Sequence, residues 1–330
     1  MEYYLGQTPL SFFISGNSGV MIFLILTGFG TYLVCERGKE SSVKYASLRF
    51  FKLAVLMFIS TITNWMLFKF HLVYYPHIVG HTNTIWIQGE SPFNNNIISL
   101  IWGNWFTIST SYNNTLWTMQ YIFFGSVICI IIYDLWGELK KGYIVPSIIG
   151  VCFVIMGPPY FVACILGYIL AHYYKKNADR QIGISWGIGL LLPVPFLCGY
   201  PMLIESQFFL YRILPEQYVE YYHMAGAFLL IYVCLFCSPV KKMMENRFFL
   251  KIGKYSMSIY TMHFTLLMSV TSYLFVKLIN RFSYNKAVLL VWVFTCFITF
   301  VVAILLKKII DSIYRWLDRA YIKLYHYMTE

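Results

Sequence analysis

The feature that most constrains this chain is a series of apolar segments, each close to the length needed to cross a lipid bilayer. A helix that spans the hydrocarbon core needs about 20 mostly apolar residues. Such segments recur along the whole sequence, and they predict about nine membrane-spanning helices. They fall near residues 18–35, 51–69, 116–135, 143–157, 159–174, 183–199, 223–238, 255–278 and 287–306. We therefore expect an all-α fold, a polytopic bundle of transmembrane helices.

The composition excludes a soluble alternative. Of the 330 residues, 59% are hydrophobic and only 12% are charged, whereas a soluble domain carries roughly 25% charged residues. A soluble fold of this length could not hide so much apolar surface in one core. Because no internal repeat, linker or low-complexity tract interrupts the sequence, we expect residues 1–330 to form a single membrane domain.

The basic residues predict how the chain is oriented. A net charge of +11 could indicate a nucleic-acid partner, but the basic residues form short clusters between the apolar segments, so we expect no nucleic-acid binding. When successive loops are assigned to alternate sides, one side holds 20 of the 25 Lys and Arg. The positive-inside rule makes that side cytoplasmic. We expect the N-terminus outside, the C-terminus inside, and an odd number of spans in a bacterial plasma membrane.

His263 is the most notable polar residue within an apolar segment. Ser256, Tyr260 and His263 follow helical spacing and are predicted to share one face. Ionisable groups inside a membrane usually face the bundle interior or a water-filled cavity. Two interpretations stay open at this point: a structural histidine bonded to a neighbouring helix, and a group that handles substrate or protons.

Arg49 and Lys52 lie at the predicted cytoplasmic entrance of the second span, three positions apart and so on one helical face. Their spacing is explained by ordinary anchoring at the lipid headgroups. An Arg beside a Lys also suits a phosphate-bearing ligand that approaches from the cytoplasm.

The long outer loop over residues 70–115 contains His71, His77 and His81. Without a helical HxxxH context or regularly placed acids, these histidines favour a solvated loop, and we expect no metal site. The apolar stretch Ile97–Thr110 is predicted to dip into the membrane interface. Cys234 and Cys237 match the CxxC spacing, but they lie in an apolar segment without a second pair, which favours buried packing.

Five segments of the sequence carry distinctive motifs: Gly16–Phe29, Tyr45–Leu53, Asn113–Met119, Ala163–Ala171 and Gly253–Phe264. In this order they are similar to the patterns G-x-x-x-V-x-x-F-F-V-L-S-G-F, R-x-x-R-L, N-x-x-L-W-T-M, L-G-x-x-L-A and G-K-I-S-x-S-L-Y-L-x-H-F. The sequence thus resembles the acyltransferase 3 family, whose members are membrane enzymes that O-acylate carbohydrates and other acceptors. The resemblance covers residues 9–306 best.

The resemblance implies a membrane acyltransferase that moves an acetyl or other acyl group from a CoA thioester to a hydroxyl of a glycan or lipid-linked sugar. Acyl-CoA, most often acetyl-CoA, would be the donor substrate, with no bound cofactor. Arg49 and Lys52 would hold the donor phosphates. His263 would be the remaining catalytic candidate, and Asn114, Trp117 and Tyr260 would position the acceptor.

The sequence departs from the family pattern in three ways. Lys52 replaces the second Arg of R-x-x-R-L, and Ile122 occupies a position where the family usually has Glu. The family's first span, which carries a histidine, would precede the start of this sequence. Two alternatives to the enzyme therefore stay open: an inactive relative that binds a glycan or partner, and a transporter of a small solute.

Overall fold

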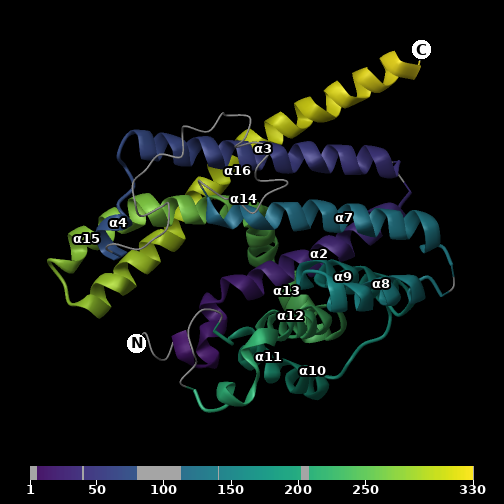
Figure 1. Cartoon of the computed structure of the whole chain (residues 1–330), viewed down its shortest axis with the longest axis horizontal. Helices are drawn as coiled ribbons and strands as arrows, with labels where there is room; N and C mark the ends of the chain where they lie inside the picture. The colour runs from purple at the N-terminus through teal and green to yellow at the C-terminus, as the bar shows by residue number, and fades with distance from the viewer. Residues whose placement is uncertain (1–5, 39–40, 80–112, 140, 202–207, 330) are drawn as a thin grey trace. The chain divides into compact units, whose positions relative to one another are not determined.

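The computed structural model describes residues 6–38, 41–79, 113–139, 141–201 and 208–329, which form helices and turns (Figure 1). The longer α-helices are α2 (Gly16–Glu36), α3 (Ser42–Lys69), α7 (Trp117–Trp136), α8 (Ile144–Met156), α9 (Pro159–Lys176), α12 (Val219–Phe236), α14 (Arg247–Leu266) and α16 (Tyr284–Thr329). The shorter ones are α4 (Pro76–Val79), α10 (Ile184–Leu191), α11 (Pro193–Cys198), α13 (Ser238–Met244) and α15 (Ser272–Ile279). Four 3-10 turns, η1 (Pro9–Ile14), η3 (Asn114–Leu116), η4 (Tyr211–Ile213) and η5 (Glu216–Tyr218), and one π-helical turn, η6 (Leu267–Thr271), complete the described chain.

The all-α, polytopic prediction is confirmed. Within the residues that the structure describes, six helical segments are long and apolar enough to cross a membrane. The other three predicted spans also lie on helices: α8, the 18-residue α9, and the successive short helices α10 and α11. Every apolar segment marked in the sequence therefore corresponds to a helix, because only a helix satisfies its own backbone hydrogen bonds in hydrocarbon.

The residue contacts divide the chain into two compact units. The first unit combines Met1–Ala46 with Tyr121–Leu250, and the second combines Ser47–Gln120 with Lys251–Glu330. The long helices α3, α7 and α14 each contribute residues to both units. The single domain expected over residues 1–330 stays a prediction.

In the first unit, α2, α9 and α12 all pack against one another. The contact between α2 and α9 is close because each helix presents a glycine to the other. A Cβ atom on Gly28 would lie 1.8 Å from the carbonyl oxygen of Cys164, and one on Gly167 would lie 1.9 Å from that of Ile25. Small residues that let two backbones touch are the usual means by which helices associate in a membrane, where lipid removes the hydrophobic drive.

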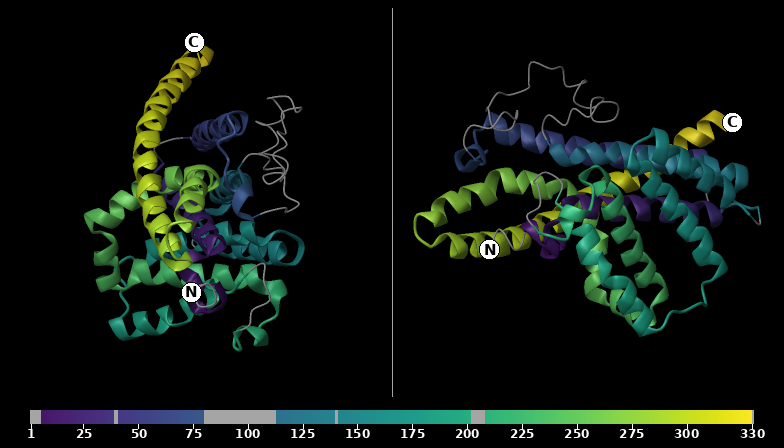
Figure 2. Two further views of the ribbon diagram at one scale, coloured as in Figure 1. Left: turned by 90° about the vertical axis from the view of Figure 1, so that its left-hand side faces the viewer. Right: turned by 60° about the horizontal axis from the view of Figure 1, so that its bottom comes forward.

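In the second unit, α3, α14 and α16 meet in an apolar cluster. Leu56 of α3, Met262 of α14, and Leu306 and Ile310 of α16 are all buried in it. Figure 2 shows α15 and the first half of α16 side by side, joined by a tight turn, and the two helices are in contact.

Helix α16 is longer than the bilayer is thick. Its 46 residues correspond to about 69 Å, against a hydrocarbon core of about 30 Å. The apolar composition ends at Leu306, after which Lys307, Lys308 and Asp311 begin a charged stretch. The C-terminal part of α16 is therefore expected to lie outside the hydrocarbon core.

The glycine contact gives a first prediction. We expect Gly28→Ala to destabilise the protein by about 1–3 kcal/mol, because the added methyl meets backbone atoms that cannot rotate away. Gly30→Ala on the same helix is the matched control, since a Cβ there meets nothing within 4 Å. Thermal unfolding in detergent measures both. Equal melting temperatures for the two variants would contradict the close α2–α9 contact.

Candidate functional site

Arg49 and Lys52, near the basic end of α3, lie in the second unit. The Lys52 ammonium is 3.4 Å from the Asp318 carboxylate and 5.5 Å from the centre of the Tyr314 ring. The Tyr314 hydroxyl donates to the Lys52 carbonyl at 2.8 Å, so α16 is bound to this end of α3. Arg49 is partly buried one turn earlier on the same helix.

This arrangement is suited to an anionic ligand. The side chains of Lys52 and Asp318 remain 35% and 44% exposed, and an ion pair this open is worth only about 0–1 kcal/mol. A phosphate group could therefore replace Asp318 at little cost. Arg49 adds a second, permanently charged group with donors spaced for bidentate binding.

A second polar group, further along the second unit, is built around Asn113, whose side chain is fully buried. Its Nδ2 donates to the Ser60 hydroxyl on α3 at 2.7 Å and to the Thr261 carbonyl on α14 at 3.0 Å. Its Oδ1 accepts from the Thr115 amide at 2.9 Å and from the Thr115 hydroxyl at 2.6 Å. All four hydrogen-bonding positions of this amide are used. One side chain thus connects α3 to α14 and caps the turn η3.

The motif that contains Asn113 continues into α7. Trp117, the first residue of α7, is partly buried, and Asn114 opens the preceding turn η3. The Tyr260 hydroxyl on α14 donates to the Thr115 carbonyl at 2.9 Å and lies 2.9 Å from the Thr118 hydroxyl. The structure therefore brings Tyr260 against the start of α7, where its two partners, Thr115 and Thr118, flank Trp117 in sequence.

His263 follows Tyr260 by one turn of α14, with the two ring centres 5.6 Å apart. Its Nδ1 lies 2.6 Å from the Tyr260 carbonyl. A carbonyl can only accept, so Nδ1 carries a proton, and in a neutral imidazole the lone pair is then on Nε2. Among the described residues, none hydrogen-bonds to Nε2. The ring is held in the tautomer that a general base requires.

The predicted site residues thus form two groups. Tyr260, His263 and the start of α7 are close together, whereas Arg49 and Lys52 lie at the other end of α3. Ser60 marks the level along α3 at which Tyr260 and His263 lie, because its hydroxyl donates to the Thr261 carbonyl at 3.2 Å. Ser60 is eleven positions beyond Arg49, or about 16 Å along the helix axis.

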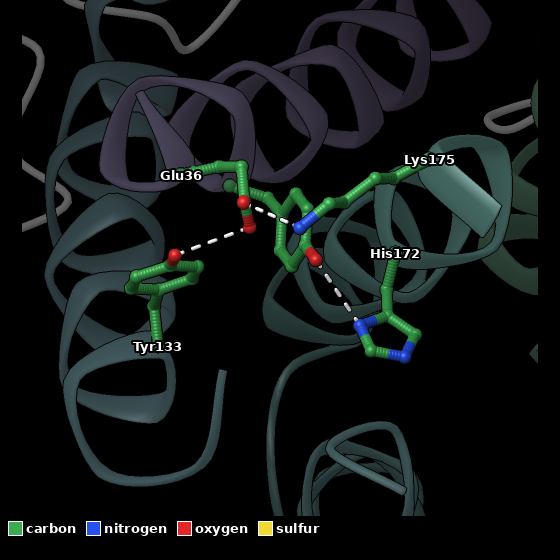
Figure 3. A network of polar contacts seen from close by, with 5 residues as sticks. Glu36, Tyr133, His172 and Lys175 are labelled. Atoms are coloured by element: carbon green, nitrogen blue, oxygen red, sulfur yellow. Dashed lines mark hydrogen bonds and ion pairs between the residues drawn. The ribbon is translucent and has the colours of Figure 1, made fainter. Parts of the chain in front are cut away.

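The first unit contains a polar network that the sequence analysis did not identify (Figure 3). The Glu36 carboxylate pairs with Lys175 and accepts a hydrogen bond from the Tyr133 hydroxyl at 3.1 Å. Next to it, the Tyr32 hydroxyl lies 3.2 Å from Nδ1 of His172. The sequence offered two signals for this network: an acid at the end of one apolar segment and a Lys at the end of another. Only the close α2–α9 contact brings them together.

A second histidine of the first unit, His223 on α12, is 1% exposed and fully hydrogen-bonded. Its Nε2 donates to the Tyr200 carbonyl at 2.8 Å, and its Nδ1 lies 2.9 Å from the Asn17 amide nitrogen. Burial also raises the pKa of the Tyr200 hydroxyl, which stays protonated and donates to the Leu214 carbonyl at 3.0 Å. These bonds connect the start of α2 to the chain around α12, which is a structural role.

The loop histidines give no assembled site among the described residues. His71 adopts a left-handed backbone conformation with φ of 54°, and His77 lies in the short helix α4. His81 and the stretch Ile97–Thr110 lie outside the described residues, so the expected interfacial segment stays a prediction. Within the described chain, no cluster of three metal-ligating residues is present.

The comparison with protein families adds an independent observation. The family model described as an acyltransferase domain matches residues 1–308, nearly the whole chain. The chain belongs to the acyltransferase 3 family. Neither the search of curated proteins nor the search of solved structures gives a match. Family membership and the apolar helices together identify a membrane protein of an acyltransferase family.

The Asn113 connection gives a second prediction. We expect Asn113→Ala to lower the free energy of unfolding by about 2–4 kcal/mol, because the change leaves several buried partners unpaired. A double-mutant cycle with Ser60→Ala should show a coupling of about 0.5–3 kcal/mol.

Ser256→Ala is the control for this cycle, since the Ser256 hydroxyl donates to the Gly253 carbonyl of its own helix at 2.8 Å. Unfolding by denaturant or heat in detergent measures all variants. Additive effects of Asn113→Ala and Ser60→Ala would contradict the direct bond.

Proposed function

We propose that this protein transfers an acyl group, most often acetyl, from a CoA thioester to a hydroxyl of a glycan or lipid-linked sugar. The observation that carries the proposal is the pairing of two features in one family member. A cationic helix end suits the phosphates of the donor, and a histidine further along the same unit is held in the tautomer of a general base.

The reaction that these groups support is a direct transfer. Nε2 of His263 takes the proton of the acceptor hydroxyl as its oxygen attacks the thioester carbonyl carbon. A new C–O bond forms, the tetrahedral oxyanion collapses, and the C–S bond breaks. The imidazolium then returns its proton to the departing thiolate, so the products are the ester and the free thiol. Asn114, Trp117 and Tyr260 would position the acceptor.

The separation of the two groups also favours such a donor. A ligand whose phosphates are bound at Arg49 must carry its acyl group about 16 Å along α3 to reach the level of His263. A thioester at the end of a long flexible arm meets that requirement, whereas a compact acyl phosphate does not. The donor would enter from the cytoplasm, which the basic residues place at this end of α3.

A test of the donor site uses Arg49→Ala. We expect the variant to raise KM for acetyl-CoA about tenfold or more, because hydrogen bonds to charged groups are worth about 1.5–3 kcal/mol. Lys308→Ala is the matched control, since Lys308 is an exposed basic residue of α16. Transfer of labelled acetyl to membrane glycans in proteoliposomes is the measurement. Identical KM values for the two variants would refute the donor site.

A test of the base uses His263→Asn, which keeps an amide donor in the place of Nδ1 and removes Nε2. We expect kcat to fall about 10²–10⁴-fold with KM for acetyl-CoA little changed. Binding of acetyl-CoA to the variant, measured separately, shows that the donor site is intact. Unchanged transfer by this variant would exclude His263 as the base.

A further inference from the structure

Three buried polar side chains in the second unit have no hydrogen-bond partner among the described residues. They are Thr61 and Asn64 on α3 and Thr265 on α14, and the unpartnered atoms are the two hydroxyl oxygens and the Asn64 amide nitrogen. The three residues are only 8%, 1% and 3% exposed. We refer to them as the α3–α14 polar cluster.

Asn64 and Thr265 lie on the faces where the two helices meet, and Thr61 directly follows Ser60 on α3. Ser60 donates to the Thr261 carbonyl on α14, and further along Trp65 and Phe68 pack against Met268, so the two helices run parallel. One turn beyond Ser60 is Asn64, and one turn beyond Thr261 is Thr265. Since residues four apart share a face, Asn64 and Thr265 reach the same level of the contact.

The local hydrogen bonding explains why Thr265 has no partner. Nearby hydroxyls bond to a carbonyl one turn earlier on their own helix: Thr63 to Ile59 and Ser269 to Thr265, both at 2.7 Å. The corresponding carbonyl for Thr265 belongs to Thr261. That carbonyl already accepts from Ser60 at 3.2 Å and from Asn113 at 3.0 Å. The bond that would satisfy Thr265 is therefore taken by the Asn113 connection.

The helix directly beyond the cluster is also unusual. The π-helical turn η6 begins two residues after Thr265, and its Met268 carbonyl accepts the amides of Tyr74 and Tyr75 at 3.0 and 3.2 Å. π-helical turns inside α-helices are frequently found at functional sites. The loop before α4 thus closes over this end of α3 and α14, next to the polar cluster.

The chemistry of the cluster indicates the kind of ligand. It offers one amide and two hydroxyls and no charge, which suits neutral hydroxyl groups and gives no particular attraction for a phosphate or carboxylate. Trp65, one turn beyond Thr61, packs against Met268, which is one turn beyond Thr265, so residues on the same helical faces add aromatic surface beside it. Uncharged hydrogen-bonding groups next to aromatic rings match a sugar, whose hydroxyls need partners and whose ring carbons do not.

We propose that the α3–α14 polar cluster binds a neutral sugar of the acceptor. The inference rests on the proposed function for the identity of the ligand as acceptor. Thr265 is two positions from His263 on α14, which places the two side chains about 3 Å apart along the axis and on opposite faces. The cluster would therefore bind a part of the acceptor that is remote from the reacting hydroxyl, and its residues would position the acceptor.

The test measures binding without any acyl donor, so its result does not depend on catalysis. The protein is placed in phosphatidylcholine nanodiscs, and its thermal unfolding is followed while glucosyl diacylglycerol is titrated in. Dioleoylglycerol, which lacks the sugar, is the matched lipid. We expect the glycolipid to raise the melting temperature of the wild type by about 2 °C or more relative to dioleoylglycerol.

The variants then locate the site. Thr61→Val, Asn64→Leu and Thr265→Val should each reduce or abolish the glycolipid shift. The control variants Thr63→Val and Ser269→Ala remove hydroxyls that bond to their own helix, and they should keep the shift. A wild type without a shift, or a shift that survives in all three cluster variants, would overturn the proposal.

The melting temperatures of the same variants without glycolipid are a second measurement. A purely structural role of these groups predicts lower values, whereas a binding role does not. Without glycolipid, we expect Thr61→Val, Asn64→Leu and Thr265→Val to unfold at the wild-type temperature or above it, because each removes an unsatisfied buried group. Melting temperatures clearly below wild type in all three would show that these groups stabilise the fold through other bonds, and the binding site would be rejected.

Discussion

The constraint on which this structure depends is that hydrocarbon offers no hydrogen-bond partner. Every polar side chain inside the helices must bond to protein or remain unsatisfied at a cost of about 1–3 kcal/mol. Asn113 meets the constraint completely: its amide uses all four positions and fixes α3, α14 and the turn before α7. Glu36 meets it in the first unit through Lys175 and Tyr133. The elements around both residues are specified by these bonds as much as by apolar packing.

The hydrogen bonds that satisfy the Asn113 amide leave the Thr265 hydroxyl without its usual acceptor. Because the Thr261 carbonyl accepts from Ser60 and Asn113, the hydroxyl of Thr265 loses the acceptor that serves the other hydroxyls of the helix. The hydrogen bonds of Asn113 and Ser60 thereby leave buried, unsatisfied polar groups between α3 and α14. The glycolipid proposal follows from this coupling, because a proposed sugar acceptor would supply the missing hydrogen-bond partners.

The two sides of the proposed reaction are separated along a single helix. The cationic groups of α3 lie near one end, and Asn64 lies five positions before the other end at Lys69. Such a layout suits an enzyme that receives a charged donor and an uncharged acceptor from opposite sides of a membrane. In the proposed reaction, α3 would supply the distance and α14 would supply the base between the two ends.

The sequence by itself determined the fold class, the family and the approximate limits of every apolar helix, because length and apolarity are local properties of a segment. It also placed His263 and Tyr260 on one helix, since their spacing is local too. Only the tertiary structure decided that Asn113 forms the buried connection and that Glu36 meets Lys175. It also decided that the Thr61 and Thr265 hydroxyls and the Asn64 amide nitrogen lack partners among the described residues. Whether a buried polar group is satisfied depends on the helix packed against it, and a motif read along one chain segment does not contain that neighbour.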